Sequence, residues 1–153
     1  MLKLADLIES QQGIRPDRTS LGISEAVIDS RLAIPASLFV AVENGHQFVK
    51  AAFQRGSNLA LIQQDVDDDI AVLDLTVPFT AQTVIPEPPF AIRVEDTTVS
   101  LQKLAAFWRK RFVIRVLGIT GSVGKSTTKE LVAEILSQRY RTLKNMGNYN
   151  NEI

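Results

Sequence analysis

The residues that decide the fold read Val113-Ile-Arg-Val-Leu-Gly-Ile-Thr-Gly-Ser-Val-Gly-Lys-Ser126. Branched apolar residues over 113–117 predict a β-strand, and residues 127–140 predict a helix with one apolar face. Glycines fill the connection between them. Backbone N–H groups and a helix N-terminus together hold polyphosphate when the loop residues are small. The order strand, glycine-rich loop, helix therefore predicts a nucleotide-binding site.

Several side chains of the loop have a specific predicted role. Lys125 would neutralise charge on the β- and γ-phosphates as the catalytic residue, and the Ser126 hydroxyl would complete the coordination of a bridging Mg²⁺. The residues predicted to bind nucleotide are Thr120, Gly121, Ser122, Val123, Gly124, Lys125, Ser126 and Thr127. The common phosphate-loop pattern has a glycine where this chain has Ile119, so the glycine spacing is a variant. The alternative is a glycine-rich turn that binds nothing, with Lys125 simply exposed.

Composition and charge exclude several classes of protein. Seventeen basic and seventeen acidic residues cancel, so no overall positive field attracts nucleic acid or anionic lipid. The chain has no cysteine, which rules out a disulfide framework and thiolate metal ligands. Asp6 and Glu9 interrupt the apolar residues at the N-terminus, and no apolar run reaches the ~20 residues needed to cross a bilayer. We therefore expect a soluble, cytoplasmic protein.

The N-terminal part of the chain predicts an α/β fold with a parallel sheet. Residues 37–42 are apolar β-formers, residues 46–55 place apolar side chains on one helix face, and Gly56 occupies a helix C-terminal position. A second apolar strand at 58–62 completes a strand-helix-strand unit. The remaining predicted elements are a short N-terminal helix, strands at 70–75 and 91–94, and a helix up to Phe112 capped by Asp96 or Thr97.

These elements divide the chain into three segments. We expect a small N-terminal α/β substrate-binding domain over residues 1–95, a connecting helix over 96–112, and an incomplete P-loop ATPase domain over 113–153. The last segment would contain the first strand, the phosphate loop and the first helix of that domain. The acidic run Asp65–Asp69 lacks the alternating ligands and central glycine of a calcium loop, so it predicts a solvated turn.

A family resemblance rests on several motifs that occur in order. The sequence Gly118-Ile-Thr-Gly-Ser-Val-Gly-Lys-Ser-Thr-Thr-Lys-Glu130 resembles the ATP loop of the Mur ligases, and its Thr-Thr-Lys-Glu end is similar to the MurF branch. The other matching motifs are Asp29-Ser-Arg31, Gly45-His-Gln-Phe-Val49, Val94-Glu-Asp-Thr97 and Asn148-Tyr-Asn-Asn-Glu-Ile153. One departure is Ala36-Ser37, which stands where the family commonly has a glycine and an acidic residue.

The resemblance implies a reaction, its cofactors and a substrate site. MurF-type enzymes use ATP and Mg²⁺ to add D-alanyl-D-alanine to a UDP-N-acetylmuramoyl-tripeptide in peptidoglycan synthesis, through an acyl phosphate. Their N-terminal domain holds the UDP end of the substrate, which makes Ser30, Arg31 and His46 the candidate substrate-binding residues here. Each has a structural alternative: Ser30 could cap a turn, Arg31 could pair with Asp29, and His46 could cap the helix that it opens.

Complete members of the family continue for several hundred residues. We therefore expect this chain to be a truncated fragment that does not ligate alone, and to self-associate or be disordered near its C-terminus because the strand over 113–117 lacks parallel neighbours. Three other functions fit part of the sequence. They are another Mur-type amino-acid ligase, a non-catalytic UDP-sugar-binding module with a vestigial P-loop, and an unrelated P-loop kinase or ATPase.

Overall fold

A computed structural model describes residues 1–17 and 19–145 of the chain. The chain divides into two compact units, Met1–Phe112 and Val113–Ile153. Within the described ranges, no helix is both long enough and apolar enough to cross a membrane. The last six residues of the family resemblance, Asn148–Ile153, lie outside the described residues.

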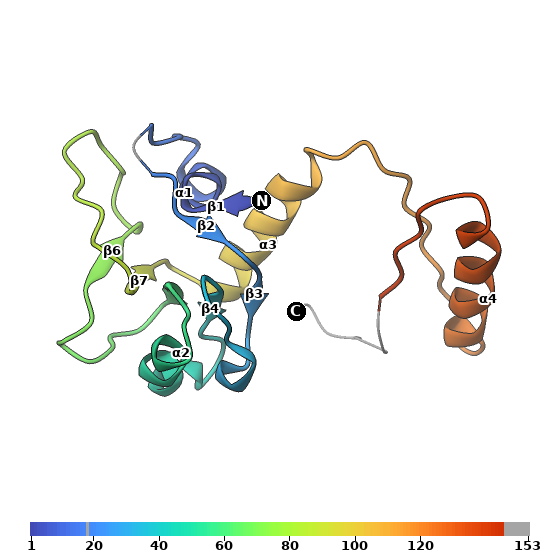
Figure 1. Cartoon of the computed structure of the whole chain (residues 1–153), viewed down its shortest axis with the longest axis horizontal. Coiled ribbons are helices and arrows are strands. Elements are labelled where there is room, and N and C mark those ends of the chain that lie inside the picture. Colours follow the sequence, from blue (N-terminus) through green and yellow to red (C-terminus); the bar gives the residue numbers. More distant parts are fainter. Residues whose placement is uncertain (18, 146–153) are drawn as a thin grey trace. The chain divides into compact units, whose positions relative to one another are not determined.

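The first unit contains the predicted parallel sheet (Figure 1). Its strands lie in the order β3 (Ala26–Val27), β4 (Leu38–Val40), β5 (Leu59–Ile62), β7 (Phe90–Arg93) and β6 (Val72–Asp74), all parallel. The central strands β4 and β5 are buried along their whole length. Continuous apolar runs of this kind are typical of a sheet that is covered on both faces. A separate antiparallel pair joins β1 (Leu2–Lys3) to β2 (Gly22–Ile23).

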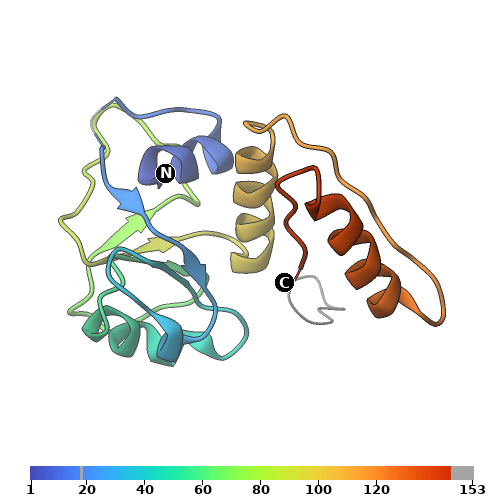
Figure 2. The same cartoon turned by 45° about the vertical axis from the view of Figure 1, so that its right-hand side comes forward.

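Helices cover the two faces of the sheet. Helices α1 (Leu4–Gln12) and α3 (Thr97–Arg109) lie side by side on one face, as Figures 1 and 2 both show. Helix α2 (Val49–Gln54) covers the other face. Residues of α1 and α3 pack with β4, β5 and β7 in one apolar cluster, and residues of α2 pack with the opposite face in a second cluster. The first unit is therefore a three-layer α/β structure.

Local sequence signals mark two helix ends of this unit. Asp96 is the N-cap of α3, because its carboxylate accepts the Val99 N–H at 2.8 Å. The helix predicted over 46–55 begins as a 3-10 turn, η2 (Gly45–Phe48), before it continues as α2. Gly56 follows it with φ of 108° and donates its N–H to the Phe53 carbonyl. The caps at Asp96 and Gly56 confirm two of the predictions.

The second unit differs from the prediction at its start. Residues 113–117 are not a strand, because no described segment forms a β-ladder with them. A strand forms only when a neighbour accepts and donates its backbone hydrogen bonds, so an apolar sequence is not sufficient. Helix α4 (Lys125–Ser137) is present; it begins two residues before the predicted Thr127 and ends before Tyr140.

Candidate functional site

The predicted phosphate loop connects the extended segment over 113–117 to α4. Gly124 is the N-cap of α4, with φ of 77°, and its carbonyl accepts the Thr128 N–H at 2.9 Å. Gly121 has φ of 152°. Both values lie where a side chain is disfavoured, so the two glycines allow a chain path that most residues would resist. The loop geometry thus depends on the residues that the motif requires.

Lys125 and Ser126 are the first two residues of α4. The first N–H groups of a helix have no partner within the helix, and they carry the positive end of its dipole. The ammonium group of Lys125 bends back over the loop, where it donates to the Gly121 carbonyl at 2.6 Å. The exposed loop therefore combines an ammonium group with a helix N-terminus, which together suit a phosphate anion.

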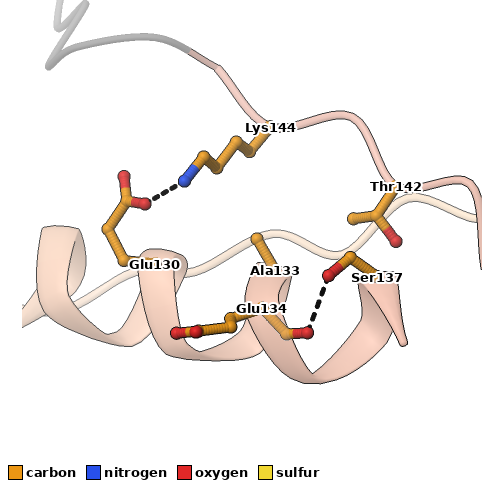
Figure 3. Close-up of a pocket in the computed structure, with 6 residues that line it drawn as sticks. All are labelled: Glu130, Ala133, Glu134, Ser137, Thr142 and Lys144. Carbon is orange, nitrogen blue, oxygen red and sulfur yellow. Dashed lines mark hydrogen bonds and ion pairs between the residues drawn. The ribbon is translucent and has the colours of Figure 1, made fainter. Parts of the chain in front are cut away.

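A polar hollow lies further along the same helix (Figure 3). It has a volume of about 420 Å³ and is lined by Glu130, Ala133, Glu134, Ser137, Thr142 and Lys144. Lys144 pairs with Glu130, and hydrogen bonds from Lys144 and then Lys129 lower the pKa of the Glu130 carboxyl. Lys129 also donates to the Asn145 carbonyl at 3.0 Å. These contacts hold residues 142–145 against α4, and no predicted nucleotide-binding residue lines the hollow.

Ser30 and Arg31 lie on a short 3-10 turn, η1 (Ser30–Leu32), just after β3. The cap of this turn is Asp29 and not Ser30, since the Asp29 carboxylate accepts the Arg31 N–H at 2.9 Å. The Arg31 guanidinium donates to the same carboxylate, with Nη2 at 2.7 Å, and this hydrogen bonding lowers the pKa of Asp29 to about 2. Arg31 nevertheless remains 81% exposed. Arg31 thus pairs with Asp29, as the structural alternative to a substrate-binding role predicted. The outer edge of its guanidinium still faces solvent.

His46 lies in η2, after the strand β4 that neighbours β3. Because the carboxyl ends of parallel strands share one edge of a sheet, His46 and the Asp29–Arg31 turn belong to the same edge. Its Nε2 accepts the Gln63 N–H at 3.0 Å, and its Nδ1 lies 3.3 Å from the Glu43 carbonyl. The residue as a whole is 9% exposed. Both nitrogens therefore bond to backbone groups, and substrate contact by His46 stays a prediction.

The sequence did not single out Gln63, which directly follows β5. The Gln63 side-chain oxygen accepts the Thr97 N–H at 2.9 Å, and thus satisfies one N–H at the start of α3. The backbone N–H of Gln63 donates a hydrogen bond to His46 Nε2. Gln63 therefore links the structures that follow β4, β5 and β7. The only available signal was a polar residue at the carboxyl end of an apolar strand, which is too common to identify such a link.

Comparison with known proteins gives consistent matches. The profile of the family described as Mur ligase middle domain matches residues 119–153. A UDP-N-acetylmuramoyl-tripeptide–D-alanyl-D-alanine ligase of Synechocystis is 40% identical over 136 residues, which are 86% of this chain and 26% of that protein. The chain is thus similar to the Mur ligases, and among them to the MurF ligases.

Solved MurF structures share the fold of this chain. MurF from Acinetobacter baumannii matches with a TM-score of 0.70 and 26% identity, over 97% of this chain and 30% of that one. MurF ligase from Thermotoga maritima in complex with ADP matches with a TM-score of 0.63 and 26% identity, over 82% of this chain and 26% of that one. The chain thus spans between a quarter and a third of the length of these relatives.

Proposed function

We propose that this chain is part of an ATP-dependent ligase that joins D-alanyl-D-alanine to a UDP-N-acetylmuramoyl-tripeptide in cytoplasmic peptidoglycan synthesis. The observation that carries the proposal is a glycine-rich loop with the sequence of a phosphate loop at the N-terminus of α4, in a chain that aligns with MurF ligases along most of its length. The ADP complex of the Thermotoga maritima relative supports ATP as the nucleotide.

Each of the three segments of the sequence has its own proposed role. Residues 1–95 hold the UDP end of the substrate, residues 96–112 form the connection, and residues 113–153 begin the ATP-binding domain. Within the first segment, Ser30 and the exposed edge of Arg31 contact the nucleotide, and His46 lies at the same edge of the sheet. The paired state of Asp29 and Arg31 supports this role, because it fixes the guanidinium in one orientation.

The reaction has two steps. A carboxylate oxygen of the peptide attacks the γ-phosphorus of ATP, and ADP leaves. The amine of D-alanyl-D-alanine then attacks the carbonyl carbon of the acyl phosphate, inorganic phosphate leaves, and the amine gives up a proton. Charge gathers on the phosphoryl oxygens in the first step. Lys125 would move from the Gly121 carbonyl to those oxygens, and the loop N–H groups would stabilise them.

The residues of the loop also suit Mg²⁺. Ser126 places a hydroxyl at the second position of α4, which is the residue type that holds this ion in phosphate loops. Among the residues that the structure describes, no group of three or more acidic or histidine side chains could hold a metal. The Ser126 hydroxyl would complete the coordination of the ion, which neutralises phosphate charge when bound.

Calorimetric titration of the purified chain with Mg-ATP tests the proposal. We expect saturable binding that Lys125→Ala abolishes. Lys129→Ala is the matched control, because it removes a lysine one turn further along α4 whose ammonium contacts the Asn145 carbonyl. If both variants bind ATP like the original chain, the loop is not the nucleotide site.

A second titration with a UDP-muramoyl tripeptide separates the remaining functions. Binding that weakens in Arg31→Ala supports the proposed substrate site. Binding of UDP compounds by a chain that never binds ATP would support a non-catalytic UDP-sugar module. Preference for a UDP-muramoyl dipeptide over the tripeptide would instead indicate another Mur-type ligase.

A further inference from the structure

A buried carboxylate at the start of α1 has three donors. Asp6 is 1% exposed. It accepts the Lys3 backbone N–H at 2.8 Å and Arg15 Nη1 at 2.7 Å, and it forms an ion pair with Arg111, whose Nη2 lies 2.8 Å away. One turn further along, Glu9 accepts Arg15 at 2.6 Å and lies 3.8 Å from Arg111. We call Asp6, Glu9, Arg15 and Arg111 the Asp6 cluster.

The Asp6 cluster has two carboxylates and two guanidinium groups, so its charges balance. Burial alone would raise the pKa of Asp6, but the hydrogen bonds from Arg15 and Lys3 and the charge of Arg111 outweigh burial and lower it. A buried charge is tolerated only while its partners remain in place. Each arginine is therefore held firmly to α1, although the two come from distant parts of the sequence.

Arg111 has a special position in the chain. It lies two residues beyond the last residue of α3 and two residues before Val113, where the second unit begins. Its guanidinium also lies over the rings of Phe107 and Trp108, at 4.9 Å and 5.4 Å from their centroids. The backbone continues as a turn, with the Arg111 N–H donating to the Trp108 carbonyl at 3.1 Å. Arg111 is thus fixed from two sides at the border between the units.

We propose that the ion pair between Asp6 and Arg111 sets the point at which the first unit ends and the connection to the phosphate loop begins. While the pair is formed, residues 110–112 continue the last turn of α3, with their N–H groups bonded to carbonyls of residues 106–109. Loss of the pair transfers these three residues to the segment that leads to the phosphate loop, which lengthens the reach of that segment by up to ~10 Å. Asp6 and Arg111 are then positioning residues, which limit the length of that segment.

The inference needs the two units but not the ligase activity, so it can be tested without substrate. Hydrogen exchange in the 153-residue chain is the measurement, with Arg111→Gln and Arg15→Gln as a matched pair. Each variant removes one guanidinium from Asp6 and leaves the other in place. We expect Arg111→Gln to speed exchange of the amides of residues 110–112 by about tenfold or more, since these open without global unfolding. Arg15→Gln should leave the exchange of these amides within about twofold of the original chain.

The chain's single tryptophan gives a second readout at the same place. Acrylamide quenching of Trp108 should increase in Arg111→Gln and stay unchanged in Arg15→Gln. If Arg111→Gln does not fold, Arg111→Lys and Arg15→Lys replace the pair, because lysine keeps the charge but loses the planar fork. Equal changes in both variants of a pair, or no change in residues 110–112, would overturn the proposal and leave the cluster as a general stabiliser.

Discussion

Strand β4 and residues 113–117 have similar apolar composition but opposite surroundings. The β4 side chains Leu38, Phe39 and Val40 are fully buried, between the parallel neighbours β3 and β5. Val113 and Val116 are exposed, and no described segment pairs with their backbone. Helix α4 forms in the same unit, because a helix satisfies its backbone hydrogen bonds within one segment. An apolar run becomes a strand only where other segments pair with its backbone and bury its side chains.

The test of this comparison with the largest expected effect replaces one leucine in each region by alanine. Leu38→Ala in β4 should lower the free energy of unfolding by about 2–5 kcal/mol, because it leaves a cavity in a closed core. Leu117→Ala, at a side chain that is 64% exposed, should change it by less than about 0.5 kcal/mol. Urea unfolding followed by circular dichroism measures both. Equal losses would show that residues 113–117 are packed in solution.

Gly56 shows how sharply the first unit constrains its backbone. An added Cβ would lie 3.2 Å from the Cα and the nitrogen of Pro35, at a φ of 108° that any side chain resists. Gly56→Ala should therefore destabilise the chain by about 1–3 kcal/mol. Gly124→Ala is the control from the second unit, where the added Cβ meets open space at φ of 77°. Gly124→Ala should lower the free energy of unfolding by less than Gly56→Ala does, as measured by the same urea unfolding.

Self-association provides the next test. We predict that the exposed apolar residues of 113–117 pair with another copy of the chain, so sedimentation at rising concentration should show species larger than a monomer. Val116→Lys should shift the equilibrium toward the monomer, since a charge protects an unpaired edge. Val84→Lys is the control, because Val84 is equally exposed in the first unit. A single monomeric species at all concentrations would contradict the prediction.

Replacing Ala36 by glycine should give a small gain in stability. It has φ of 64° in a turn closed by the hydrogen bond from the Ser37 N–H to the Ile34 carbonyl. An alanine in this region costs ~1–2 kcal/mol, whereas glycine loses ~0.5–1 kcal/mol more entropy on folding. Ala36→Gly should thus stabilise the chain by about 0.5 kcal/mol. A loss of stability would mean that the alanine methyl group makes a contact of greater value.

The smallest expected effect is the pH dependence at Asp29. The Arg31 hydrogen bond holds its folded pKa at about 2, below the usual 3.8, so the pair stabilises the fold above pH 4. That contribution is lost as the pH falls from about 4 to about 2. In Asp29→Asn, unfolding midpoints measured between pH 5 and pH 2 should fall less steeply than in the original chain. The effect should be slight because the pair is exposed to solvent.

Features that depend on neighbouring residues could be predicted from the sequence. The buried strands β4 and β5, the Asp96 cap, the glycine after α2 and the glycine-rich loop before α4 each have a local pattern. Features that depend on distant partners could not. The two-residue strands β1, β2 and β3 exist only through pairing, and the bonds of Gln63 join three separate elements. In the Asp6 cluster, Arg111 lies more than one hundred residues from its partner.

The position of β7 has a consequence for biosynthesis. Strand β7 lies between β5 and β6, although both of its neighbours precede it in the chain. Its residues also reach both apolar clusters, with Phe90 and Ile92 in one and Ala91 in the other. Until β7 has been made, β6 has no partner in the sheet and one edge of β5 stays open to wrong pairing. The sheet of the first unit is therefore completed only after residues 90–93 have been made.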